Sequence, residues 1–118
     1  MKFIRLVFIF VALFMMAGCS HIPVEPPVVS SPLVIDVRTE LEWQGGHLQG
    51  AVLIPHDRIE QGIGAVAPDK DKKIYLYCRS GRRTGIAFDA LKRLGYTDLV
   101  NLETLEKASR ELNLPIVK

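Results

Sequence analysis

Short apolar runs alternate with helix-forming segments from residue 33 to the end of the chain, and this alternation most limits the possible fold. Four runs have the length and composition of buried strands: residues 33–37, 51–54, 74–77 and 99–102. Strands that alternate with helices predict an α/β domain, a doubly wound parallel sheet with helices on both faces. Ligands of such sheets bind beyond the carboxyl ends of the strands.

Four helices are expected between and after these strands. Thr39 and Glu42 have the spacing of a capping box, which predicts a short helix before the next glycines. Asp57 can cap a second helix. Residues 84–94 repeat apolar side chains at helical spacing, and residues 104–111 form the last helical segment. The domain is therefore expected to cover residues 33–118.

Residues 1–18 are predicted to be a secretory signal peptide. Lys2 and Arg5 precede an apolar run, residues 6–17, which is shorter than the roughly 20 residues that a membrane-spanning helix needs. The run ends in Met16-Ala17-Gly18-Cys19, which resembles a bacterial lipobox. This resemblance implies cleavage before Cys19 and lipid attachment to it. Ordinary cleavage, which leaves a free Cys19, is the alternative.

The resemblance also implies a location. Ser20 follows the cysteine, in place of the aspartate that retains many lipoproteins at the inner membrane. We therefore expect a lipid anchor in the bacterial outer membrane that faces the periplasm, and no other contact with a membrane. Residues 19–32 contain four of the seven prolines, so they are predicted to be an extended tether.

The charge and the residue counts exclude several classes of function. After residue 18 the chain has 13 basic and 13 acidic residues, which argues against nucleic-acid binding driven by net charge. Two cysteines cannot build a disulfide framework, and three scattered histidines (His21, His47 and His56) exclude most metal sites. We expect neither a metal nor a cofactor.

Cys78 has the surroundings of a reactive thiol. It follows the third strand and precedes a tight loop and a helix, so its sulfur should face unpaired N–H groups and the positive end of a helix dipole. Both favour the thiolate, and so do nearby guanidinium groups. Gly81 lets the loop curl into an anion nest, and Thr84 can cap the helix or donate to the sulfur. An inert buried cysteine is the alternative.

Three motifs together resemble the rhodanese sulfurtransferases. They are Asp36-Val37-Arg38 followed by Glu42, the segment Gly46-His47-Leu48-Gln49-Gly50-Ala51-Val52-Leu53-Ile54-Pro55, and the loop Cys78-Arg79-Ser80-Gly81-Arg82-Arg83-Thr84. They have the order and spacing of the family and span most of the domain. The small single-domain periplasmic members are the most similar. One departure is residues 101–106, which lack the Gly-Gly and tryptophan of many rhodaneses.

The resemblance implies a two-step sulfur transfer with no cofactor. Cys78 takes the sulfane sulfur of thiosulfate or a similar donor as a persulfide and passes it to a thiophilic acceptor, such as cyanide or an unidentified thiol or protein. The small anionic donor is expected to bind the loop residues Arg79, Ser80, Gly81, Arg82, Arg83 and Thr84.

The other motif residues are expected to be structural. Arg38 should form an ion pair with Glu42 or Asp36, and His47 should stabilise a turn through hydrogen bonds. His56 follows the strand-ending proline and has no assigned role.

Three rival functions are considered. A phosphatase loop needs an arginine six residues after the cysteine, where this chain has Thr84. A thiol–disulfide oxidoreductase needs a resolving cysteine near Cys78. A non-catalytic rhodanese-like module for binding or sensing remains as the alternative function, although inactive family members usually lose the cysteine.

Overall fold

The computed structural model describes residue 18, residues 23–24, residue 26 and residues 30–118. Nearly all of the predicted signal peptide, the predicted lipid attachment at Cys19 and most of the predicted tether lie outside the described residues and stay predictions. Within the described part of the chain, no helix is long and apolar enough to cross a membrane.

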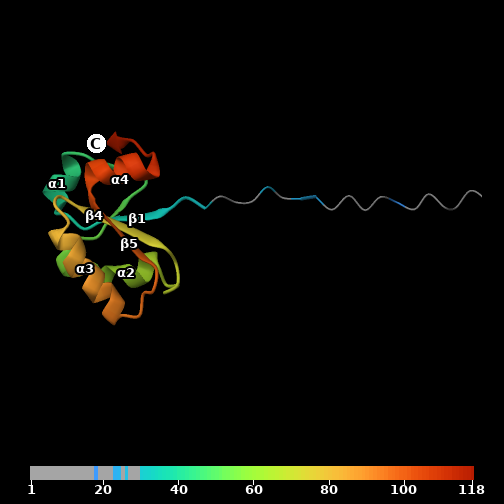
Figure 1. The fold of residues 1–118 in the computed structure, drawn as a ribbon, viewed down its shortest axis with the longest axis horizontal. Coiled ribbons are helices and arrows are strands. Elements are labelled where there is room, and N and C mark those ends of the chain that lie inside the picture. The colour runs from blue at the N-terminus through green and yellow to red at the C-terminus, as the bar shows by residue number, and fades with distance from the viewer. Residues whose placement is uncertain (1–17, 19–22, 25, 27–29) are drawn as a thin grey trace, which may run out of the picture.

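The centre of the domain is a four-stranded parallel sheet with the strand order β3-β1-β4-β5 (Figure 1). Its strands are β1 (Leu33–Asp36), β3 (Val52–Leu53), β4 (Ile74–Cys78) and β5 (Leu99–Thr104). Each begins at the predicted position or one residue later. The prediction of an α/β fold with a parallel sheet is confirmed.

Helices cover both faces of this sheet (Figure 1). The helices α2 (Ile59–Val66) and α3 (Arg82–Arg93) lie on one face, and α1 (Glu40–Gln44) and α4 (Leu105–Leu112) lie toward the other. Successive strand residues point to opposite faces, so β4 contributes to two separate cores. Side chains that pack with α2 and α3 include Ile35, Leu76, Cys78, Ala87 and Leu91. Those that pack with α4 include Val34, Tyr77, Leu102 and Ala108.

The strand order places a topological switch between β1 and β4. The chain passes from β1 to β3 on one side and from β4 to β5 on the other. The two central strands are in register, with Asp36 opposite Tyr77, so their carboxyl ends lie side by side. A crevice at this point is where open α/β sheets bind ligands, and both the Asp36-Val37-Arg38 motif and Cys78 reach it.

The structure corrects the prediction for Asp57. This residue does not cap α2, because the chain after Pro55 first winds into a 3-10 turn, η1 (His56–Arg58). Helix α2 then begins at Ile59 without a side-chain cap and continues to Val66.

A second pair of strands was not predicted. Strand β2 (His47–Leu48) pairs antiparallel with β6 (Ile116–Val117), which connects the end of the chain to the segment after α1. Two-residue strands are too short to show a hydrophobic period, so no local sequence pattern marks them.

Candidate active site

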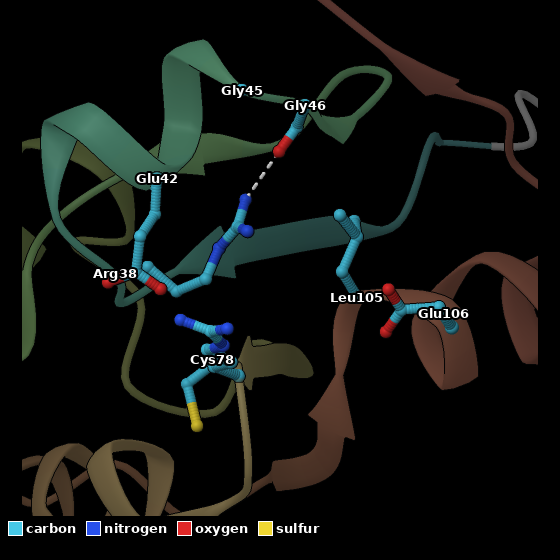
Figure 2. Close-up of a pocket in the computed structure, with 8 residues that line it drawn as sticks. Arg38, Glu42, Gly45, Gly46, Cys78, Leu105 and Glu106 are labelled. Atoms are coloured by element: carbon cyan, nitrogen blue, oxygen red, sulfur yellow. Dashed lines mark hydrogen bonds between the residues drawn. The ribbon is translucent and has the colours of Figure 1, made fainter.

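A pocket of about 290 Å³ opens beyond the carboxyl ends of β1 and β4. Figure 2 shows Arg38, Glu42 and Gly46 on one side and Leu105 and Glu106 of α4 on the other. Its lining consists of Arg38, Glu42, Gly45, Gly46, Cys78, Arg79, Leu105 and Glu106. This volume suits a small molecule rather than a folded partner.

Cys78 is the last residue of β4, and its side chain lies inside the loop that leads to α3. The backbone N–H of Gly81 donates to Cys78 Sγ at 2.9 Å. Burial acts to raise the pKa of the Cys78 thiol, but hydrogen bonds from the backbone N–H groups of Thr84, Ser80 and Gly81 outweigh it. The pKa is therefore lowered, which favours the reactive thiolate.

Gly81 gives the loop this inward curl. It is the N-cap of α3 with φ of 92°, a left-handed conformation that residues with a Cβ adopt only with strain. The Oγ1 hydroxyl of Thr84 donates to the carbonyl of Gly81 at 2.7 Å and lies 3.8 Å from Cys78 Sγ. Thr84 therefore braces the first turn of α3 beside the sulfur and does not serve as the helix cap.

Asp36 and Arg38 form a buried ion pair at the end of β1. Arg38 Nη2 lies 2.7 Å from Asp36 Oδ2 and also donates to the carbonyl of Gly46 at 2.7 Å (Figure 2). The guanidinium lies over the ring of Tyr77, 5.4 Å from its centroid. Of the two predicted partners for Arg38, the structure selects Asp36.

Glu42 pairs instead with Arg83. The contacts are bidentate, 2.6 Å from Arg83 Nη1 to Glu42 Oε1 and 2.9 Å from Nη2 to Oε2. The hydrogen bond from Arg83 lowers the pKa of Glu42 to about 2, and a hydrogen bond from Thr39 adds to this effect. The pair connects α1 to the first turn of α3, which follows the Cys78 loop.

The three arginines of the loop therefore have different positions. Helix α3 begins at Arg82, two residues before its predicted start, so Arg82 and Arg83 belong to its first turn. Arg83 contacts Glu42, and Arg82 is exposed and does not line the pocket. Arg79 alone of the three contributes to the lining. The structure thus separates the positions of the three arginines, and the expectation that they bind the anionic donor stays a prediction.

Ser80 acts on Cys78 through its backbone N–H group and not through its side chain. Its side chain is exposed, and its N–H group helps to lower the pKa of Cys78.

Neither of the two histidines of the domain lines this pocket. His47 stacks on Trp43 with ring centroids 3.6 Å apart, and its Nδ1 lies 3.0 Å from the carbonyl of Trp43. These contacts fit the expected structural role in a turn. His56 is half-buried in η1 and does not line the pocket. Among the described residues, no group of three or more His, Cys, Asp or Glu side chains could hold a metal ion.

The site residues predicted from the sequence do not include Leu105 and Glu106 on the α4 side of the pocket. Strand β5 has a bulge beside Leu76 and Tyr77, after which Glu103 adopts a left-handed φ of 65°. The chain then turns into α4, which brings Leu105 and Glu106 to the pocket. One available signal was their position directly after a parallel strand, at the edge of the sheet where ligands bind.

The fold and this cysteine loop define a class of protein. The family model described as the Rhodanese-like domain matches residues 25–104, and the chain belongs to that family of sulfurtransferases. The thiosulfate sulfurtransferase PspE of Escherichia coli is 35% identical over 92 residues, which cover 78% of this chain and 85% of PspE.

A solved structure supports the same assignment. The chain described as a rhodanese with anions from E. coli superposes with a TM-score of 0.67 and 34% identity, over 74% of this chain and 98% of that chain. A tRNA uridine(34) hydroxylase of Erwinia tasmaniensis is also similar, 30% identical over 90 residues, which cover 70% of this chain and 26% of the hydroxylase. The family thus includes proteins whose names state another activity.

Proposed function

We propose that this protein transfers a sulfane sulfur from thiosulfate, or a similar donor, through a persulfide on Cys78 to a thiophilic acceptor. The observation that carries the proposal is the cradle of N–H groups around Cys78 Sγ, with the Gly81 N–H at 2.9 Å. These groups lower the pKa of the thiol and are placed to bind an anionic sulfur species. The similarity to PspE, named as a thiosulfate sulfurtransferase, supports thiosulfate as the donor.

The first half-reaction follows from this geometry. The Cys78 thiolate attacks the sulfane sulfur of thiosulfate, the S–S bond of the donor breaks, and its electron pair leaves with sulfite. The charge balances, because the reactants are a thiolate with one negative charge and thiosulfate with two. The products are a persulfide anion with one negative charge and sulfite with two. The persulfide anion accepts hydrogen bonds from the loop, and Arg79 at the pocket attracts the donor.

The second half-reaction regenerates the thiolate. An acceptor such as cyanide attacks the outer sulfur of the persulfide, and the bond between the two sulfurs breaks with its electron pair on Cys78 Sγ. Neither step requires a general base, since a thiolate is the nucleophile and no proton has to move. This agrees with the position of His47 and His56 outside the pocket lining.

The test is the mass of the intact full chain after incubation with thiosulfate. We expect a gain of one sulfur atom, its removal by cyanide with formation of thiocyanate, and complete loss of both in Cys78→Ser. Cys19→Ser is the matched control, since it removes the only other cysteine and should leave the gain intact.

Two results would contradict the proposal. One is sulfur uptake that survives in Cys78→Ser. The other is a folded wild-type chain with a free Cys78 thiol that takes no sulfur from thiosulfate or from other sulfane donors. The second result would favour the non-catalytic binding or sensing module, for which an anion bound at the same loop without transfer is the expected observation.

A further inference from the structure

The charged side chains that line the pocket differ in whether they are neutralised. Arg38 is paired with Asp36, and Glu42 is paired with Arg83, so these four charges cancel locally. Arg79 and Glu106 also line the pocket, and neither forms an ion pair with any residue that the structure describes. One free cation and one free carboxylate therefore face the same small cavity.

The backbone of Glu106 is held firmly at the edge of the pocket. It is the second residue of α4, and the N-cap Thr104 accepts a hydrogen bond from the N–H of Lys107 at 3.1 Å. Leu105 and Ala108 anchor the same turn in the core. Figure 2 shows Glu106 across the pocket from Glu42 and Arg38. A carboxylate in the first turn of a helix also interacts favourably with the helix dipole.

We propose that Glu106 is a specificity-determining residue, and that it makes the pocket prefer a small acceptor thiol carrying an ammonium group over a purely anionic one. This inference rests on the proposed function. Once Cys78 holds a persulfide anion, Arg79 offsets one negative charge and Glu106 leaves one uncompensated. An acceptor with an ammonium group restores neutrality, whereas an acceptor that is only anionic meets repulsion.

A zwitterionic aminothiol carboxylate matches both free charges. Its carboxylate can face Arg79 and its ammonium group can face Glu106. A molecule of this size fits in a cavity of about 290 Å³. In the transfer step the acceptor thiolate attacks the outer sulfur of the Cys78 persulfide, and the S–S bond breaks with its electron pair on Sγ. The products are the Cys78 thiolate and the acceptor persulfide, so charge and electrons balance without an oxidant.

The experiment compares two acceptors on the full chain loaded with sulfur by thiosulfate. Cysteine and 3-mercaptopropionate differ by the ammonium group, and intact mass follows the loss of the persulfide. The measured quantity is the ratio of the two rate constants, cysteine over 3-mercaptopropionate, in each variant relative to wild type. This comparison cancels the intrinsic reactivity of the two thiols.

We expect Glu106→Gln to lower this ratio about fivefold at low salt, and the difference to shrink as the ionic strength rises. Glu111→Gln is the matched control, because both glutamates are exposed on the same helix and only Glu106 lines the pocket. Its ratio should stay that of wild type. An unchanged ratio in Glu106→Gln, or an equal change in both variants, would overturn the role of Glu106.

A second readout separates this inference from the proposed function. Alkylation of Cys78 by iodoacetate and by neutral iodoacetamide, followed on the Cys78 peptide, reports the charge at the sulfur without any sulfur transfer. Glu106→Gln should raise the iodoacetate rate relative to iodoacetamide about fivefold, and Glu111→Gln should not. If the wild type takes no sulfur but Glu106→Gln still shifts the ratio of alkylation rates, the sulfurtransferase activity alone is refuted. Sulfur transfer without the shift would refute Glu106 alone.

Discussion

Two ion pairs border the pocket, and they differ in burial and in the distance along the chain that they connect. Asp36 and Arg38 are two residues apart, with side chains 0% and 8% exposed. Glu42 and Arg83 are 41 residues apart, with side chains 24% and 19% exposed. The first pair stabilises the end of one strand from inside the core, whereas the second joins α1 to the helix that follows the Cys78 loop. We therefore expect the first pair to support the fold and the second to position the Cys78 loop.

The largest effect is expected from Arg38→Met. This change leaves Asp36 fully buried without its partner and removes the hydrogen bond to the carbonyl of Gly46. Breaking a buried pair on one side typically costs about 3–5 kcal/mol, because the remaining charge is desolvated and unpaired. Urea unfolding of the full chain measures the loss of unfolding free energy.

The double variant Asp36→Asn with Arg38→Met tests the cause. It removes the stranded charge, so it should be more stable than Arg38→Met alone. Arg58→Met is the matched control, since Arg58 is exposed and forms no ion pair among the described residues. Equal losses in Arg38→Met and Arg58→Met would show that the buried pair does not support the fold.

A smaller effect on stability, with a distinct effect on catalysis, is expected from Glu42→Gln. Loss of the bidentate contact to Arg83 should cost about 1–2 kcal/mol. Because Arg83 lies in the first turn of α3, the loop before it loses a restraint, and persulfide formation should slow about 10-fold. Reactions with thiosulfate, quenched at successive times and analysed by intact mass, give this rate.

Glu40→Gln serves as the comparison for that change. Glu40 is exposed in the same turn of α1, so its variant should keep both the stability and the rate. If Glu42→Gln forms the persulfide as fast as wild type, the pair between Glu42 and Arg83 does not position the loop.

The same contrast explains how much of the structure was predictable. The strands, the loop around Cys78 and the structural role of His47 depend on contacts between near neighbours in the chain, and such signals are local. The partner of Glu42 depends on where α3 comes to lie beside α1, which no spacing rule encodes across 41 residues. For Arg38 the sequence left two partners open, Asp36 and Glu42, because both acids are close to it along the chain. The choice between them depends on Arg83 occupying Glu42, which is the same long-range contact.

The α4 side of the pocket shows a second limit. The absence of a Gly-Gly pair in residues 101–106 was visible in the sequence, but its structural result was not. Glu103 takes the left-handed conformation at this turn, with the N–H of Glu103 bound to Asn101 Oδ1 at 2.9 Å. A side-chain hydrogen bond thus supports a turn that glycine would make without strain. Only the folded bulge reveals that Glu106 then reaches the pocket.

The smallest expected effect is a dependence on pH of the free energy of unfolding that comes from the Glu42 carboxylate. The pKa of Glu42 is lowered to about 2 from its ordinary value of 4.5, chiefly by the hydrogen bond from Arg83. Between these values the unfolded chain binds a proton that the folded chain does not, so the stabilisation is complete above about pH 4.5 and is lost as the pH falls toward about 2. The difference in unfolding free energy between wild type and Glu42→Gln should therefore be constant near neutrality and shrink below about pH 4.5. Urea unfolding of both chains from about pH 7 to about pH 3 measures this difference. A difference that stayed constant over the acid range would mean that the carboxylate of Glu42 does not stabilise the loop through Arg83.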